Sequence, residues 1–256
     1  MNKLRTLLFF ILPLALISCT DTREELEIKK DGSGTLVMKT DFGKILEMVK
    51  GMGENNDLSK DGLDKPYDTT MYLKDVIDTA KNVPTDQKKL LRDGKVHLVL
   101  NVKESLGKMD MNFPFASTAN LQDLYASLNS STSGLKNLFN GMGKNLPKND
   151  DSSSDKGMPQ IASVYDIVVK DGFYSRKVNK QRYDEFAQSM KLDELKQMGS
   201  MFGAMDYTLT VKLPRAIKKV SNSKVTLSED KKTAALKTDL METFAHPELL
   251  ALEIEY

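Results

Sequence analysis

Few residues of this chain have the types and spacing that catalysis or metal binding needs. The 256 residues include one Cys, Cys19, and two His, His97 and His246. A metal site normally needs three or four ligands, so two separated His without a second Cys do not form one. Neither His lies near a Ser in a nucleophile-elbow pattern, and a Ser-His-Asp hydrolase therefore has no support in the sequence.

The densest carboxylate pairs are Glu24-Glu25 and Asp150-Asp151. General acid–base catalysis needs a carboxyl group that is fixed and partly desolvated. The first pair opens a strand-like segment and the second lies in a polar, Ser-rich stretch, so we interpret both as solvated charge. The Asp/Ser stretch also lacks the ligand alternation and the closing Glu of a calcium loop. We expect no catalytic residue, no metal site and no cofactor.

Gly32-Ser33-Gly34 resembles a phosphate-binding loop in its spacing of Gly residues. Such loops lead into the N-terminus of a helix, where backbone N–H groups bind the anion. Here the segment leads into alternating residues from Thr35 to Lys39, which predict a strand. We therefore interpret Asp31-Gly32 as the turn of a β-hairpin, since Asp-Gly suits a positive backbone φ.

The strongest chemical signal is Cys19 itself. Two basic residues, Lys3 and Arg5, precede an apolar run over residues 7–16, and Leu16-Ile17-Ser18-Cys19 follows. The run is shorter than the ~20 residues of a membrane-spanning helix, and its layout is that of an export signal. The four last residues resemble a bacterial lipobox. An ordinary secretory signal with an incidental Cys is the alternative.

The lipobox resemblance implies a specific modification. Residues 1–18 would be a lipoprotein signal peptide that is removed, and the Cys19 thiol would receive a diacylglycerol. The amine of Cys19 is usually acylated as well, for example with palmitate. Two or three acyl chains give stable attachment where a single chain gives only marginal attachment.

Methionine is the other unusual feature, with 14 residues in the chain. Several lie where amphipathic stretches run into Gly, among them Met52, Met142 and Met201. Gly ends helices and Met fills irregular gaps, so core packing is one interpretation. Another is an adaptable apolar surface for a partner, peptide or lipid, and we take these three Met as the candidate interaction surface. Capture of Cu(I) by thioethers is a third, which the loose spacing disfavours.

Composition excludes several classes of protein. Hydrophobic residues make up 40% of the chain, which is enough for a core and excludes wholesale disorder. The formal net charge of +1 argues against a nucleic-acid binder, which needs a basic excess to neutralise phosphates. A single Cys excludes a disulfide framework.

Alternating apolar residues predict three β-hairpins, each followed by an amphipathic helix. The hairpins cover residues 25–39, 96–115 and 164–178, and the helices begin near Asp41, Ser117 and Asn179. The C-terminal part predicts a strand that ends at Pro214, a hairpin over 225–238, a short helix over 241–250 and a final strand. We predict an α+β fold, with a mainly antiparallel sheet built from repeated β-hairpin–helix units and helices packed on one face.

Two segments lack periodicity, residues 54–68 and 144–159, and both predict mobile surface loops. We expect a single α+β domain over residues 19–256 that carries these loops. A boundary in the second loop, which would separate 19–143 from 160–256, is the alternative.

Parts of the chain resemble known lipoproteins. Cys19 followed by Glu24-Glu25-Leu26 and the turn Asp31-Gly32-Ser33-Gly34 resembles the start of a group of uncharacterised Bacteroidetes lipoproteins. The strand over residues 207–214 with its Leu-Pro end, together with Ser221-Asn222, resembles LppM-like lipoprotein domains. These motifs are strand and turn signatures, so the resemblance implies a lipid-anchored architecture and an outer-membrane location, and transfers no site residue.

The sequence therefore leads to a functional hypothesis. We expect a membrane-anchored cell-envelope lipoprotein, held in the outer membrane by lipid on Cys19, that acts as a non-catalytic binding or interaction module. Its partner would be an envelope protein or an apolar ligand, and not nucleic acid. The alternatives are a carboxylate-dependent envelope hydrolase, which needs two converging carboxylates in a closed pocket, and a carrier or sensor of an apolar ligand, which needs an enclosed apolar cavity.

Overall fold

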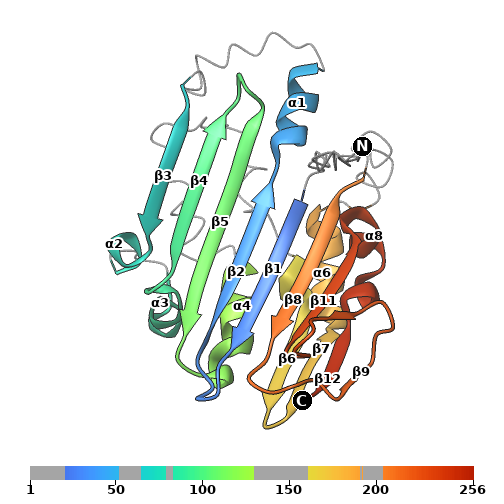
Figure 1. The fold of residues 1–256 in the computed structure, drawn as a ribbon. Helices are drawn as coiled ribbons and strands as arrows, with labels where there is room; N and C mark the ends of the chain where they lie inside the picture. The colour runs from blue at the N-terminus through green and yellow to red at the C-terminus, as the bar shows by residue number, and fades with distance from the viewer. Residues whose placement is uncertain (1–20, 52–64, 79–82, 130–160, 191, 193–203) are drawn as a thin grey trace, which may run out of the picture.

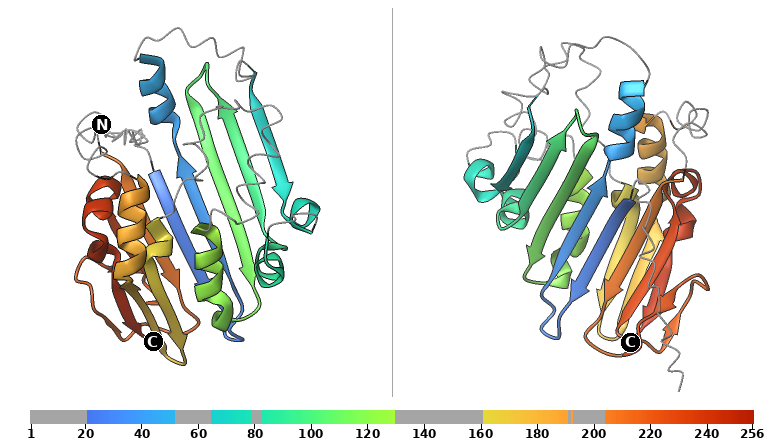
Figure 2. Two further views of the ribbon diagram at one scale, coloured as in Figure 1. Left: turned by 180° about the vertical axis from the view of Figure 1, so that it is seen from behind. Right: turned by 45° about the horizontal axis from the view of Figure 1, so that its top comes forward.

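A computed structural model of the chain describes residues 21–51, 65–78, 83–129, 161–190, 192 and 204–256. The fold is mixed α+β, as predicted, and is dominated by a large, mainly antiparallel sheet (Figure 1). A second, smaller sheet lies behind one half of the large one (Figure 2).

The large sheet has eight strands in the order β10-β11-β8-β1-β2-β5-β4-β3. Neighbouring strands are antiparallel except for β1 and β8, which run parallel in the middle of the sheet. The bounds are β1 Asp21–Ile28, β2 Gly34–Asp41, β3 Tyr67–Tyr72, β4 Lys95–Asn101, β5 Leu106–Phe115, β8 Asp206–Lys212, β10 Thr226–Leu227 and β11 Thr233–Asp239.

The small sheet has four antiparallel strands in the order β6-β7-β12-β9. Its strands are β6 Tyr165–Lys170, β7 Phe173–Val178, β9 Lys219–Val220 and β12 Leu252–Glu255. The α-helices are α1 Gly43–Gly51, α2 Lys74–Ile77, α3 Thr85–Leu91, α4 Leu121–Asn129, α6 Lys180–Met190 and α8 Leu240–Ala245. Short 3₁₀ turns are η1 Thr118–Asn120, η3 Ile161–Val164 and η4 Pro247–Leu250.

The first hairpin follows from its sequence as predicted. Gly32 has a φ of +80°, which L side chains rarely adopt, and the Asp31 carboxylate accepts hydrogen bonds from the backbone and hydroxyl of Ser33. The register pairs Leu26 with Leu36 and so aligns the apolar faces of β1 and β2. A side chain at Gly34 would collide with the backbone oxygen of Glu27, because the strands approach closely there.

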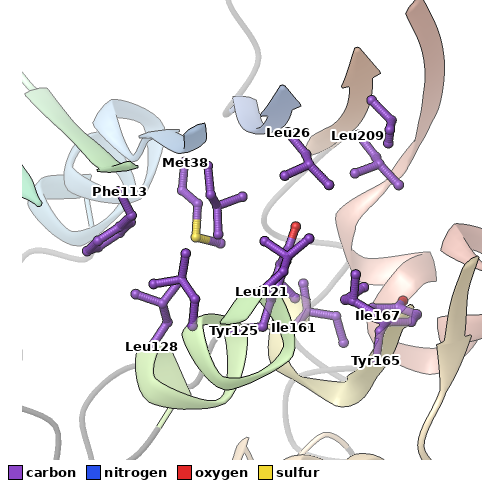
Figure 3. Close-up of a cluster of buried hydrophobic side chains, with 14 of the residues drawn as sticks. Leu26, Met38, Phe113, Leu121, Tyr125, Leu128, Ile161, Tyr165, Ile167 and Leu209 are labelled. Carbon is purple, nitrogen blue, oxygen red and sulfur yellow. The ribbon is translucent and has the colours of Figure 1, made fainter. Parts of the chain in front are cut away.

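The core lies between the large sheet and the layer behind it. Figure 3 shows Leu121 and Leu128 of α4 packing toward Met38 and Phe113 of the large sheet. Met38 is 2% exposed and Phe113 is fully buried. Helix α4 covers β2 and β5, and the small sheet covers the strands beside them (Figure 2). Four of the described Met are buried, which assigns them to core packing: Met38, Met109, Met111 and Met205.

The outer face of the large sheet is polar, and cross-strand ion pairs join its strands. Lys39 pairs with Glu25 across β1 and β2, and Lys212 pairs with Glu27 across β1 and β8. Lys237 pairs with Asp206 across β11 and β8. The strands therefore alternate between a buried face and a solvated face, which is typical of an antiparallel sheet covered on one side.

The edge of the small sheet at β6 is closed by helix α4. The backbone N–H of Ile167 donates to the side-chain oxygen of Gln122 at 2.6 Å. An unpaired strand edge can template pairing with another chain, so this side-chain contact protects β6.

Several sequence predictions need correction. The predicted loop 54–68 is wrong at its end, since β3 begins at Tyr67. Strand β3 and helices α2 and α3 were not predicted, because β3 is polar and α2 and α3 are too short to show a period. The third hairpin belongs to the small sheet and not to the large one. The loop 144–159 and the rest of the first loop up to residue 64 lie outside the described residues, and the single domain stays a prediction.

Candidate functional site

The most distinctive group of side chains is a buried charge cluster between the two sheets. Glu24 comes from β1 of the large sheet and Arg176 from β7 of the small sheet, and both side chains are 0% exposed. Four buried Tyr surround them from α4, β6, β7 and β8: Tyr125, Tyr165, Tyr174 and Tyr207. Five separate elements therefore meet in what we call the Glu24–Arg176 cluster, defined by these six residues.

Both oxygens of the Glu24 carboxylate are engaged. Arg176 Nη1 donates to Oε1 at 2.5 Å, and Nη2 donates to Oε2 at 3.1 Å, which is the bidentate geometry of a strong charge-assisted pair. The Tyr125 hydroxyl donates to Oε1 at 2.5 Å, and the Tyr207 hydroxyl donates to Oε2. Each oxygen thus accepts two hydrogen bonds, and the carboxylate is fully coordinated without water.

The guanidinium of Arg176 also contacts aromatic rings. Its Cζ lies 3.9 Å from the centroid of the Tyr165 ring and 5.9 Å from that of Tyr125. Cation–π attraction of this kind helps to stabilise a charge that has lost its water. The Tyr165 hydroxyl donates to the backbone oxygen of Pro247 at 2.7 Å, which fixes the ring in place. Within the described part of the chain, Arg176 Nε and the Tyr174 hydroxyl have no hydrogen-bond partner.

The electrostatics keep Arg176 charged and the Tyr hydroxyls neutral. Burial is the largest single effect and disfavours the guanidinium cation, but the Glu24 carboxylate and the surrounding Tyr side chains together outweigh it and hold the pKa of Arg176 well above its usual value. Burial, reinforced by the Glu24 charge, raises the pKa of Tyr125 and Tyr207 well above the ordinary range. Burial raises the pKa of Tyr174 to about 12, and the nearby Arg176 charge limits the rise.

This arrangement favours structure over chemistry. A general acid or base must reach a substrate proton, whereas the Glu24 carboxylate is sealed from solvent and already accepts hydrogen bonds from three residues. Glu24 is also the only buried carboxylate among the residues that the structure describes. The cluster joins the two sheets through one ion pair, and the Tyr125 hydrogen bond adds α4.

Our interpretation of Glu24 and Glu25 as solvated charges is wrong for Glu24, which is buried. It is correct for Glu25, which is partly exposed. Glu25 lies on the outer face and pairs with Lys39, while Glu24 points into the core. The sequence does contain a signal for the burial of Glu24, because Glu24 alternates in phase with Leu26 and Ile28. Arg176 is likewise in phase with Tyr174 on β7.

The structure does not describe most of the residues that the sequence singled out as candidate sites. Cys19 and the candidate interaction surface of Met52, Met142 and Met201 lie outside the described residues, as does Asp150-Asp151. Their contacts with one another therefore stay untested.

The two His lie far apart in the sequence, and His97 is half-buried whereas His246 is exposed. His97 Nε2 lies 2.9 Å from Asp68 Oδ1 on the outer face, and His246 Nδ1 lies 3.3 Å from Glu248 Oε1. Within the described ranges, no group of three or more His, Cys, Asp or Glu side chains is placed to hold a metal ion.

The buried pair yields a stability prediction. Glu24→Gln leaves the Arg176 cation buried without a counter-charge, so the free energy of unfolding should fall by about 3–5 kcal/mol in urea titrations. The neighbouring Glu25→Gln change removes a carboxylate of the same size from an exposed pair and should change little. Combining Glu24→Leu with Arg176→Met should cost less than the sum of the two single changes. Full additivity would show that the two charges do not interact.

The raised pKa values of the Tyr hydroxyls predict alkaline lability. Below about pH 10, the ordinary Tyr value, folded and unfolded chains are both protonated and the stabilisation is fully present. Above it, unfolded Tyr ionises while the buried hydroxyls do not, so stability is lost as pH rises toward the folded values. Urea titrations at increasing pH should show this fall. Tyr174→Phe should reduce its slope by about 1.4 kcal/mol per pH unit, and an unchanged slope would contradict the assignment.

Comparison of the chain with protein-family models, curated proteins and solved structures found no match. The resemblance to Bacteroidetes and LppM-like lipoproteins therefore stays a prediction. In the described part of the chain, no helix has the length and apolar character required to cross a membrane.

Proposed function

We propose that the protein is a cell-envelope lipoprotein, anchored in the outer membrane by lipid on Cys19, that acts as a non-catalytic binding or interaction module. The observation that carries the proposal is the position of the lipobox relative to the fold. Strand β1 begins at Asp21, two residues after the Cys, and it lies in the middle of the large sheet. The anchor would thus be joined almost directly to a central strand of the large sheet.

The surroundings of β1 favour such an attachment. It is hydrogen-bonded to β2 on one side and to β8 on the other, and it carries Glu24 into the buried cluster. A strand held at both edges and by a buried ion pair resists local unfolding better than a terminal strand at a sheet edge. A lipid on Cys19 would therefore hold the whole sheet.

A non-catalytic role is supported by how Glu24 is used. The hydrolase alternative calls for two converging carboxylates in an accessible pocket. The buried carboxylate of the described residues is instead neutralised by Arg176 and by two Tyr hydroxyls. Its role is structural, which leaves the surface of the molecule as the place for function.

The finer architecture is part of the same proposal. Hairpins β1–β2, β4–β5 and β6–β7 are each followed along the chain by a helix, respectively α1, α4 (after the turn η1) and α6. We propose that these are repeated β-hairpin–helix units with helices packed on one face of the sheet. Each unit would then end in a Gly/Met-rich segment, which brings Met52, Met142 and Met201 into equivalent positions as the interaction surface.

The interaction surface can be tested by Met→Ser changes at positions 52, 142 and 201. If these Met contact a partner, the variant should melt as the wild type does while its photo-crosslinked products in native membranes are lost. Met38→Ser is the matched control, because Met38 is 2% exposed and its loss should cost about 2–5 kcal/mol. A triple variant that melts as poorly as this control, with crosslinking retained, would assign the three Met to the core.

The anchor can be tested at Cys19. Cys19→Ala should abolish incorporation of labelled palmitate and leave the signal peptide uncleaved, since both steps need the thiol. The protein should then no longer enter the detergent phase as a processed lipoprotein. Ser18→Ala keeps a small residue before the cleavage point and should be processed normally. Detergent partitioning of Cys19→Ala at the mature mass would refute the anchor.

A further inference from the structure

If Cys19 is lipidated, almost no chain separates the membrane from the large sheet. Only Thr20 lies between Cys19 and the first residue of β1, Asp21. Consecutive Cα atoms are 3.8 Å apart, so the Cα of Asp21 lies within about 8 Å of that of Cys19. The end of the sheet at which β1 begins is thereby held close to the bilayer surface.

Strand directions identify what else lies at this end. Strand β8 runs parallel to β1 and pairs Asp206 with Asp21, and β11 pairs Asp239 with Asp206. Strand β2 runs antiparallel to β1 and ends at Asp41, after which α1 extends beyond the sheet (Figure 1). We call this the anchor-proximal end, defined by these four Asp and by α1. The turn between β1 and β2 lies at the opposite, distal end (Figure 1).

The anchor-proximal end is charged but internally paired. Asp21 pairs with Arg23 and Asp206 with Lys237. Asp41 accepts from the N–H of Gly43 at the start of α1. Asp239 likewise accepts from the backbone N–H of Glu242 and so caps α8. Such a surface suits the hydrated headgroup layer, since moving these charges into hydrocarbon would be costly.

The outer face of the large sheet is a poorer surface for lipid contact. Lys39–Glu25 and Lys212–Glu27 lie on it as partly exposed pairs. Laying this face flat on the bilayer would desolvate these pairs without providing them with new partners. An upright molecule avoids that cost. Strand β1 has 8 residues, so the distal end would stand about 25 Å further from the anchor.

We propose that the anchor-proximal end docks on the headgroup layer of the bilayer, and that the short connection from Cys19 through Thr20 holds it there with the distal end pointing away. The inference rests on the proposed lipid anchor and adds to it an orientation and a contact surface.

Single-Cys reporters can measure this orientation, because lipidation blocks the thiol of Cys19. Glu47→Cys on α1 and Glu104→Cys in the β4–β5 turn place an exposed thiol near the anchor-proximal end. Asp171→Cys places one at the β6–β7 turn, which lies at the distal end with the β1–β2 turn (Figure 1). Each lipidated variant carries a fluorophore in vesicles of phosphatidylethanolamine and phosphatidylglycerol. A headgroup spin label should quench the first two fluorophores several-fold more than the third, and a deep acyl-chain spin label should quench none.

The outcomes separate the two proposals. A protein that does not float with the vesicles refutes the anchor and this inference together. Flotation with equal quenching at all three sites, or with none at positions 47 and 104, refutes the orientation alone. A flexible Gly/Ser linker of about 15 residues after Thr20 spans roughly 20 Å and should abolish quenching at position 47 while flotation persists. Quenching that survives the linker would refute the role of the short connection.

Discussion

The structure depends on one buried ion pair between its two sheets. Removing Glu24 and Arg176 from water is costly, and the cost is offset only because the geometry is bidentate and two Tyr hydroxyls complete the carboxylate. The pair also fixes strand register. A slip of β1 by one residue would bury Arg23 and Glu25 and expose Leu26, so alternative pairings of the sheet are disfavoured.

The same cluster also determines how helix α4 packs against the two sheets. Helix α4 contributes Tyr125 to the carboxylate and Gln122 to the edge of β6, so one helix contacts both sheets. Its apolar side then packs on β2 and β5. With this interior closed, the charges of the outer face pair with one another across the strands. The proposed role in binding, at the ends and surfaces of the molecule, is compatible with a rigid interior of this kind.

Local patterns were sufficient for much of the fold. The Asp31-Gly32 turn, the alternation in β1, β2, β4 and β5, and the end of β8 before Pro214 follow from backbone preferences that act within a few residues. The candidate site was harder to predict. Glu24 is expected in solvent because the Glu24-Glu25 pair opens a strand, although its phase with Leu26 indicates the core.

The long-range features had no local signal. The partner of Glu24 lies 152 residues away in a different sheet, and a periodic pattern cannot say which strands share a sheet. The parallel pairing of β1 with β8 is likewise invisible to alternation, which predicts a strand but not its neighbour. Periodic patterns therefore predict most of the strands and helices, but not β3, α2 and α3, and not the contact that joins the two sheets.

The parallel pairing of β1 with β8 has a consequence for folding. Strands β2, β5, β4 and β3 can assemble on one edge of β1 from the first half of the chain, but the other edge waits for Tyr207, which lies 183 residues after Glu24. Such high contact order slows folding. Until β8 arrives, a central strand is an open edge and the Glu24 carboxylate lacks its hydrogen bond from Tyr207, so the nascent protein is exposed to aggregation in this interval. The completed chain removes both hazards in a single late step.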